Sequence, residues 1–432
     1  MPIVPRKTCR ACGSPALTPV IDLGDQFLQG SFVKPGETAP VQQKFPTALV
    51  RCDPARDPSA CGLLQLAQTL PPELLYEVYW YRSGTNQTMR DHLGHIAATA
   101  AQWVPESGGR VLDIGCNDGT MLRAYPRHWA RYGIDPSDIA QEIKDGIQVV
   151  QGCFPSPALD NATGGIPFDV ITSIAMFYDL ESPIDFARAI KRHLAPRGVW
   201  IFEMSYMPEM LRLGSYDTIC HEHLEYYSLA VIDFILRQSN LCLFDATLND
   251  INGGSICCYA THMDNISWRN SGGDLRLHQL RNRESELSLD TDAPYLHFQQ
   301  RAEDNRRNLR SLLLRLKSEG KKIHIYGAST KGNTILQFCG LDYSIIDFAA
   351  DRNPDKHGAR TLGTDIPILS EAESRALSPD YYLVLPWHFR NEFLVREREM
   401  LAAGVQMIFP LPEIEIVGGS RMPGAIASAV RA

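Results

Sequence analysis

The chain has 432 residues, 44% of them hydrophobic and 21% charged, and its formal net charge is −8. This length exceeds what one hydrophobic core usually organises, so we expect two or three domains of ordinary globular composition. The negative charge argues against nucleic acid or an anionic membrane surface as the main partner. No apolar run reaches the roughly 18 to 20 residues that span a bilayer, and the first residues lack a signal-peptide pattern. We therefore expect a cytoplasmic protein whose eleven cysteines are reduced thiols or metal ligands.

Residues 1–70 are rich in proline, glycine and cysteine and contain little apolar sequence, so we expect a small module that a metal stabilises. Two pairs of cysteines, separated by about forty residues, supply four thiolates with the chemistry of a structural zinc site. The predicted ligands are Cys9, Cys12, Cys52 and Cys61. The second pair is more widely spaced than is usual, and four free thiols are the alternative.

An α/β pattern begins in the next segment, residues 71–268. Four apolar stretches predict strands, and helical sequence such as residues 184–198 lies between them. The stretches are residues 110–114, 131–135, 168–177 and 198–206. Strands that alternate with helices at this spacing predict a doubly wound parallel sheet.

The last segment, residues 269–432, starts with polar sequence. Residues 281–292 predict a linker or a solvated loop, and residues 296–320 predict a long amphipathic helix that ends at Gly320. A second α/β pattern follows, with strands predicted near residues 323–326, 345–351 and 380–385.

A glycine-rich turn, Asp113-x-Gly115-x-x-x-Gly119, follows the first predicted strand of the middle segment. Glycines let a backbone approach a ligand closely, and Asp135, at the end of the next strand, is placed to accept ribose hydroxyl hydrogen bonds. Spacing alone does not separate a dinucleotide from an adenosyl ligand, but the full pyrophosphate fingerprint is absent. The turn resembles motif I of the class I S-adenosylmethionine-dependent methyltransferases. A tight turn without a ligand is the alternative.

The stretch TICHEHLEYYSL, residues 218–229, has three interpretations. A metal site lacks a marked third ligand and the H-E-x-x-H spacing. Buried or solvated histidines without chemistry are the second interpretation. The third is an acid/base centre: methyl transfer to carbon needs a carbanion equivalent, the accessible one is an enolate beside a ketone, and histidine is the commonest base that forms it. In a strand His221 and His223 would face the same side, and Glu222 would serve His223 only if the backbone turns.

The order of these motifs resembles the sugar C-methyltransferases. The cysteine module, the first glycine turn and the His-Glu-His segment are followed by NGGS at 252–255, YGASTKGNT at 326–334 and DRNPDKHG at 351–358. The resemblance covers about residues 7–415. It implies an α/β protein with a zinc module, a class I Rossmann-like methyltransferase domain and a C-terminal Rossmann-like domain that helps bind a nucleotide sugar.

The resemblance also implies the chemistry: methylation of C3 in a nucleotide-linked 4-keto-deoxysugar. His223 maps to the base, with Glu222 and His221 beside it as catalytic residues. The residues assigned to S-adenosylmethionine are Tyr81, Ser83, Gly84, Asp113, Gly115, Asn117 and Asp135. The residues assigned to the substrate are Tyr227, Asn252, Lys331, Asn333, Arg352 and Trp387.

Three positions depart from the family pattern. Cys220 replaces a tyrosine and is predicted to be a packed thiol, and Ser173 and Phe177 stand where relatives often carry an asparagine and a histidine. The departures leave the identity of the sugar and the proton transfers open.

The sequence leaves three alternative functions open: an O- or N-methyltransferase on a nucleotide sugar, an NAD-dependent nucleotide-sugar epimerase or dehydrogenase, and a binding protein without catalysis. We expect a monomer.

The second glycine turn, near Lys331, has charge and helix amides that favour a nucleotide diphosphate. A plain turn is the alternative there, and core packing is the alternative for Trp387.

Overall fold

A computed structural model describes residues 3–38, 41–71, 73–76, 80–104, 107–267 and 272–418. Its contacts divide the chain into two compact units, one made of Met1–Gly30 and Val41–Ala302, the other of Ser31–Pro40 and Glu303–Ala432. The domain limits 1–70, 71–268 and 269–432 stay a prediction. Within the described residues no helix combines the length and the apolar character that crossing a bilayer requires.

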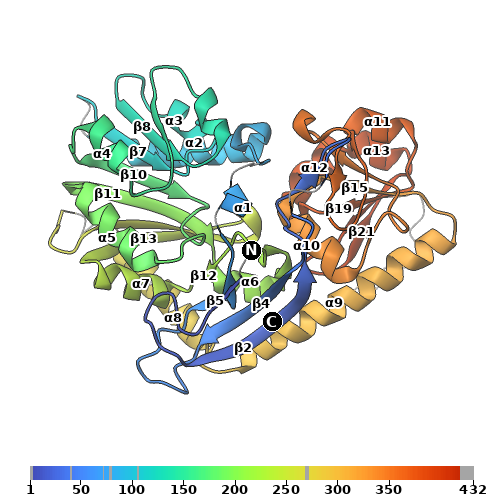
Figure 1. The fold of residues 1–432 in the computed structure, drawn as a ribbon, viewed down its shortest axis with the longest axis horizontal. Helices are drawn as coiled ribbons and strands as arrows, with labels where there is room; N and C mark the ends of the chain where they lie inside the picture. Colours follow the sequence, from blue (N-terminus) through green and yellow to red (C-terminus); the bar gives the residue numbers. More distant parts are fainter. Residues whose placement is uncertain are drawn as a thin grey trace. The chain divides into compact units, whose positions relative to one another are not determined.

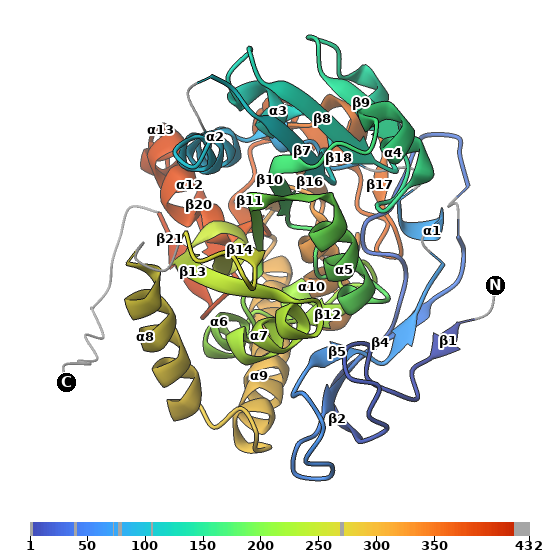
Figure 2. The ribbon, with the colours of Figure 1, turned by 90° about the vertical axis from the view of Figure 1, so that its left-hand side faces the viewer.

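The N-terminal part of the first unit is a four-stranded antiparallel sheet, in the order β12-β5-β4-β2. Its strands are β2 (Leu17–Gln26), β4 (Phe45–Cys52), β5 (Leu64–Leu66) and β12 (Glu225–Tyr226). A separate pair joins β1 (Val4–Pro5) to β6 (Gln68–Thr69). Strand β12 comes from the stretch that follows His-Glu-His, so the module is completed by a distant part of the chain, as Figure 2 shows beside β5 and β4.

The central sheet of the first unit has seven strands in the order β13-β14-β11-β10-β7-β8-β9. Figure 1 labels β8, β7, β10, β11 and β13 of this sheet. The strands are β7 (Arg110–Ile114), β8 (Ala130–Asp135), β9 (Gln148–Gln151), β10 (Phe168–Ile174), β11 (Leu194–Ser205), β13 (Leu241–Asn249) and β14 (Ser255–His262). Strands β7 to β11 pair in parallel, and β14 runs antiparallel to β11 and to β13. The four predicted strands are confirmed as β7, β8, β10 and β11. The edge strand β9 and the β13–β14 hairpin were not predicted.

Alternation along the central strands explains how the sheet is covered on both faces, because successive side chains point to opposite sides. Leu112, Ile171 and Phe202 belong to one buried cluster, which includes residues of α5 and α7. Val111 and Val170 belong to the other, which includes residues of α2. The parallel sheet is therefore buried on both faces, as near-continuous apolar strands require.

The helices of the first unit connect these strands. They are α1 (Glu73–Tyr76), α2 (Gln87–Ala101), α3 (Thr120–Ala124), α4 (Pro157–Thr163), α5 (Pro183–His193), α6 (Met207–Leu213), α7 (Leu229–Gln238) and α8 (Gly273–Glu286). Short 3-10 helices are η1 (Ser83–Thr85), η2 (Asp138–Glu142), η3 (Tyr216–Thr218) and η4 (Ile251–Gly253).

The expectation of a linker over 281–292 was wrong in its first half, which belongs to α8. Leu277 and Leu280 of this helix are buried. Glu284 accepts hydrogen bonds from the Tyr206 hydroxyl at 2.6 Å and from the first amides of α7. This charged sequence thus forms a packed helix. Its buried carboxylate, that of Glu284, is tolerated there because it has hydrogen-bond partners. The long helix is confirmed as α9 (Ala293–Ser318).

The second unit contains a six-stranded sheet in the order β18-β16-β15-β19-β20-β21. Its strands are β15 (Ile323–Tyr326), β16 (Phe348–Asp351), β18 (Ile368–Ser370), β19 (Tyr381–Val384), β20 (Gln406–Phe409) and the antiparallel β21 (Glu415–Val417). Its helices are α10 (Thr330–Cys339), α11 (Glu371–Ala376), α12 (Arg390–Arg396) and α13 (Arg398–Ala402), with η5 (Pro354–Lys356) and η6 (Trp387–Phe389). Strand β3 (Phe32–Val33) pairs with β17 (Arg360–Thr361). The predicted strands are confirmed as β15, β16 and β19.

Candidate active site

The four predicted zinc ligands lie together. The sulfur atoms of Cys9, Cys12, Cys52 and Cys61 are all within 4.8 Å of one another. The Cys9–Cys61 and Cys12–Cys52 sulfur distances are 3.6 and 3.4 Å. Tetrahedral zinc with bonds of about 2.3 Å places its sulfurs about 3.8 Å apart. The donor set and its spacing fit a structural zinc ion, and the wide second pair is accommodated because Cys52 ends β4 while Cys61 lies just before β5.

The first glycine turn connects β7 to α3 at the switch point of the sheet, between β7 and β10. Gly115 and Gly119 have φ angles of +73° and +76°, a region that L side chains rarely adopt. The Asn117 amide donates to Asp135 Oδ2 at 2.8 Å, and the Ser137 amide donates to Oδ1 at 2.8 Å. The acid at the end of β8 is thereby held beside the turn, where doubly wound sheets bind their ligands.

The segment Tyr81–Gly84 lies against this turn. The Asn117 side chain donates to the Tyr81 carbonyl at 3.0 Å and accepts from the Ser83 amide at 3.0 Å. The Gly84 amide donates to Asp118 Oδ2 at 2.8 Å. Six of the seven residues assigned to the cofactor therefore belong to one connected group, namely Tyr81, Ser83, Gly84, Gly115, Asn117 and Asp135. Asp118 was not assigned, although it lies inside the motif.

The seventh, Asp113, lies in the interior of β7 with 4% of its surface exposed. It accepts a hydrogen bond from the Thr172 hydroxyl at 2.6 Å. Burial, with the nearby charge of Asp135, raises the pKa of Asp113 to about 7. Its carboxyl group joins β7 to β10 directly below the turn, so it supports the glycine turn from the interior of the sheet.

The His-Glu-His segment is a turn and not a strand, so the strand geometry in which His221 and His223 share one face does not apply. The His223 amide donates to the Cys220 carbonyl at 3.2 Å, and strand β12 starts only at Glu225. The two imidazoles consequently have different neighbours. Cys220 is fully buried, and burial raises the pKa of its thiol well above the ordinary value, which agrees with a packed thiol.

His223 is almost buried, with 9% exposure. Its Nδ1 lies 2.8 Å from the Thr218 carbonyl oxygen, so Nδ1–H is the donor and the lone pair of the neutral ring is on Nε2. The ring centroid lies 4.2 Å from that of Tyr178. Backbone and aromatic contacts thus fix both the tautomer and the orientation of this imidazole.

Two acids neighbour His223: Glu222 precedes it in the chain, and Asp179 follows Tyr178, whose ring contacts the imidazole. Burial raises the pKa of Glu222 to about 7. Burial, together with the charges of Glu222 and Glu225, raises the pKa of Asp179 well above its ordinary value. Asp179 was not among the predicted site residues. Perturbed acids next to an oriented histidine are typical of proton-transfer sites.

The loop after β10 brings these two regions together. The Met176 side chain approaches Gly115, where an added Cβ would lie 3.2 Å from its Cγ. Two residues later, the Tyr178 carbonyl accepts from the Leu224 amide at 2.8 Å while its ring packs on His223. The first glycine turn and the His223 imidazole therefore border the same short loop.

Two predicted substrate residues in the first unit have different environments. Tyr227 is fully buried, stacks on Phe177 with centroids 5.2 Å apart, and donates to the Phe177 carbonyl at 3.3 Å. Asn252 lies in η4 with a φ of +55°, directly before the glycines that precede β14.

The other predicted substrate residues lie around the second glycine turn. Lys331 and Asn333 are in the first turn of α10, and Asn333 is buried. Arg352 is exposed next to Asp351, and Trp387 begins η6 after β19 with 6% exposure. All four belong to the carboxyl edge of the second sheet, the edge at which such folds bind ligands.

Three sequence families match consecutive parts of the chain. A zinc-binding domain matches residues 9–76, a methyltransferase domain matches residues 85–243, and the C-methyltransferase C-terminal domain matches residues 250–412. Each match coincides with a site described above.

This protein is an S-adenosylmethionine-dependent C-methyltransferase.

Among known proteins, C-methyltransferase NovU of Streptomyces niveus is 27% identical over 425 residues, which is 96% of this chain and 97% of NovU. The tRNA U34 carboxymethyltransferase of Pseudoalteromonas translucida is 32% identical over 108 residues, 23% of this chain and 33% of that protein. A solved structure of the amino pentose methyltransferase CalS10 of Micromonospora echinaspora has a TM-score of 0.31 and 15% identity, over 39% of this chain and 90% of CalS10.

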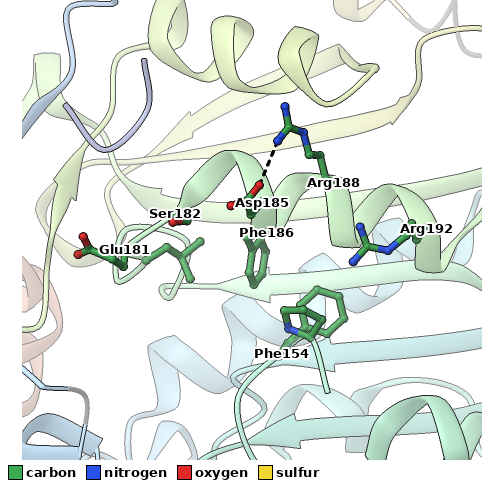
Figure 3. Close-up of a pocket in the computed structure, with 9 residues that line it drawn as sticks. Phe154, Glu181, Ser182, Asp185, Phe186, Arg188 and Arg192 are labelled. Carbon is green, nitrogen blue, oxygen red and sulfur yellow. Dashed lines mark hydrogen bonds and ion pairs between the residues drawn. The ribbon is translucent and has the colours of Figure 1, made fainter. Parts of the chain in front are cut away.

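One pocket of this methyltransferase is lined by residues other than the predicted site residues (Figure 3). Its lining is Phe154, Pro155, Leu180, Glu181, Ser182, Asp185, Phe186, Arg188 and Arg192. Arg188 pairs with Asp185 at 3.0 Å, and Glu181 pairs with Arg10 at 3.4 Å. None of the assigned site residues lines it, and much of its charge is already paired.

Sequence reasoning missed a polar cluster in the methyltransferase domain. Glu203, 2% exposed on β11, accepts from His92 Nε2 at 2.7 Å and from the Asn249 side chain at 2.7 Å. It links α2, which follows the Tyr81–Gly84 segment, to the end of β13 next to Asn252. An acid within an otherwise apolar strand was the available signal, because a buried carboxylate requires partners.

Proposed function

We propose that this C-methyltransferase acts on a nucleotide-linked ketosugar and that His223 removes the proton next to the ketone. The carbon that loses its proton becomes an enolate and is then the methyl acceptor. A phosphate-binding type of turn in a second Rossmann-like unit supports a nucleotide-bearing substrate. The resemblance to sugar C-methyltransferases supports the ketosugar.

One observation carries the proposal. The Nδ1–H of His223 donates to the Thr218 carbonyl at 2.8 Å, so the neutral ring has its lone pair on Nε2. A histidine whose tautomer is fixed by a backbone acceptor is suited to general-base catalysis near neutral pH. One loop contacts both regions, with Met176 near Gly115 and Tyr178 against the His223 ring, which supports a base close to the methyl donor.

Glu222 has the complementary role in this proposal. With a pKa raised to about 7 by burial, its carboxyl group carries a proton in part of the molecules at neutral pH. It is therefore able to donate a hydrogen bond to the ketone oxygen, where negative charge develops as the enolate forms. His221 has other partners, on β4 of the N-terminal module.

S-adenosylmethionine, when bound, supplies the methyl group to the nucleophilic carbon. The residues that we assign to holding it are those that converge on the first turn, with Asp135 toward the ribose and the Tyr81–Gly84 segment against Asn117. The second unit is assigned to the nucleotide, through the first turn of α10 and Trp387. A cytoplasmic monomer is the matching expectation, and the net charge of −8 favours a small-molecule substrate over nucleic acid or an anionic membrane.

The decisive experiment follows the C3 proton of nucleotide-linked 4-ketosugars by NMR in D2O, with and without S-adenosylhomocysteine. We expect enzyme-dependent loss of the C3 signal. His223→Ala should slow it at least a hundredfold while the affinity for S-adenosylmethionine stays within twofold. His278→Ala, which changes an exposed histidine of α8, is the matched control.

The outcome separates the alternatives. Normal exchange in His223→Ala would remove the base from the proposal. Methylated product without any C3 exchange would instead favour an O- or N-methyltransferase, because transfer to those atoms needs no enolate. Oxidation or epimerisation that depends on NAD would overturn the proposal altogether.

A further inference from the structure

We propose that the N-terminal zinc module positions the base: His221 is a positioning residue that anchors the segment 218–226 to the module, and the metal keeps that anchor in place. This inference rests on the proposed function of His223, but the anchoring itself is a property of the chain alone. In this proposal the zinc site stabilises the module and also keeps His223 in position for the proton transfer.

The His221 ring faces the module and not His223. Its Nε2 lies 3.1 Å from the Pro46 carbonyl oxygen, 3.3 Å from that of Phe45 and 3.1 Å from the Thr47 hydroxyl. Nε2–H is therefore the donor, and all three partners lie at the start of β4. The ring is 1% exposed and meets Phe45 edge-on with centroids 5.8 Å apart. A side chain with these partners has no room for a substrate.

The backbone around His221 is held by the same module. The His221 amide donates to the Gln29 side chain at 3.2 Å. On the other side of His223, the Leu66 amide of β5 donates to the Leu224 carbonyl at 2.9 Å, and β12 pairs with β5. The turn that carries Glu222 and His223 is thus fixed to β4 at its start and to β5 at its end.

The metal site joins these two strands at their far ends. Cys52 is the last residue of β4, and its amide donates to the Leu63 carbonyl at 2.8 Å, between Cys61 and β5. Arg10, located between Cys9 and Cys12, donates to the Leu66 carbonyl at 2.7 Å. The four ligands therefore close the β4–β5 hairpin. The loop that carries Cys9 and Cys12 also contacts β5, through Arg10.

The module also contacts the Glu222 side chain. A Cβ at Gly30 would overlap the Glu222 carboxylate oxygen, so the module backbone is in direct contact with this group. Gly30 does not have a positive φ angle. An alanine there would displace the carboxylate without straining the backbone.

The first test uses His221→Leu and His221→Gln. The leucine removes the donor, whereas the glutamine amide can donate to the same carbonyls. We expect His221→Leu to slow C3 proton exchange at least tenfold with the pH profile unchanged, because the base is still His223. Glutamine should restore most of the rate, and the affinity for S-adenosylmethionine should stay within twofold in both.

The second test needs no substrate. Amide hydrogen exchange of the full chain is measured by mass spectrometry, zinc-loaded and after removal of zinc by a chelator. We expect exchange in residues 218–227 to rise at least tenfold when zinc is removed, and equally in zinc-loaded His221→Leu. Residues 110–137, which carry the cofactor turn, should change less than twofold.

Two results would overturn the inference: unchanged protection of residues 218–227 without zinc, or equal loss of activity in His221→Leu and His221→Gln. A wild-type chain that exchanges no ketosugar proton would overturn the proposed function instead. The amide-exchange result would then decide the anchoring by itself.

Discussion

The two sheets repeat one architecture with different chemistry. Numbered by sequence within each unit, the five parallel strands have the same spatial order, 3-2-1-4-5, in both sheets. Both first strands lead into a glycine turn and a helix. The Gly115 amide donates to the Ile134 carbonyl at 2.8 Å, and the Gly327 amide donates to the Ala350 carbonyl at 2.8 Å.

The acids at the ends of the second strands also correspond. Asp135 accepts from two amides at 2.8 Å, those of Asn117 and Ser137. Asp351 accepts from the Ala328 and Asn353 amides at the same distance. In each case one oxygen holds the glycine turn and the other holds the amide two residues later.

The difference lies in the third partner of each acid. For Asp135 it is the Ser137 hydroxyl, at 2.5 Å. For Asp351 it is the ammonium of Lys356, which lies 3.6 Å away and donates to the Ala328 carbonyl at 2.7 Å. The third partner is thus a hydroxyl group for the first acid and a cation for the second. We expect this difference between the side chains to select different ligands at two turns with similar backbones.

The largest effect is expected from a substitution at Asp135, which tests whether the two acids differ in ligand binding. Asp135→Asn should weaken S-adenosylmethionine binding about a hundredfold, because each hydrogen bond to a charged group contributes about 1.5–3 kcal/mol and the ribose offers two hydroxyls. Isothermal titration calorimetry measures the change.

The matched control is the same substitution at the corresponding position. Asp351→Asn should leave the affinity for S-adenosylmethionine within twofold. Equal weakening by both substitutions would mean that the two acids only maintain their turns and that the assignment of the cofactor to the first turn is wrong.

A smaller effect is expected at the cation that distinguishes the second turn. Lys356→Met should lower the free energy of unfolding of the second unit by about 2–3 kcal/mol, because Asp351 is buried and loses its counter-charge. Denaturant unfolding measures it. In the double variant with Asp351→Asn the loss should be partly recovered, and strict additivity of the two single changes would contradict the pairing.

The sequence predicted what depends on local spacing and on restrictive chemistry. A strand, a glycine turn and a helix form one contiguous motif, so Gly115 and Asp135 were accessible without knowledge of the tertiary structure. Thiolates have few other uses in a small module with a poor core, so Cys52 and Cys61 were predicted despite their separation.

What was not predicted depends on contacts between distant segments. The pairing of β12 with β5 turns His221 toward β4, and no periodicity in residues 218–229 encodes that direction. Glu284 belongs to a helix rather than a linker because the start of α7 supplies its donors. The anchoring of Glu222 against Gly30 likewise follows from tertiary packing, to which a pattern in one segment is insensitive.

The smallest expected effect concerns Asp113, which corresponds in position to Ile325 of the second sheet. Burial raises its pKa to about 7 in the folded chain, against about 3.9 in an unfolded one. Between these values the folded state binds more protons, so the free energy of unfolding should fall as the pH rises from about 4 to about 7. Asp113→Asn, which resembles the protonated acid and keeps an acceptor for Thr172, should flatten this dependence by about 1–2 kcal/mol in urea unfolding of the cofactor-free protein. The control Asp91→Asn, at an exposed position of α2, should leave the curve of unfolding free energy against pH parallel to that of the wild type. A parallel curve for Asp113→Asn would instead show that the Asp113 carboxyl is ionised throughout this pH range. The two sheets would then differ in charge at this strand as well as at the turn.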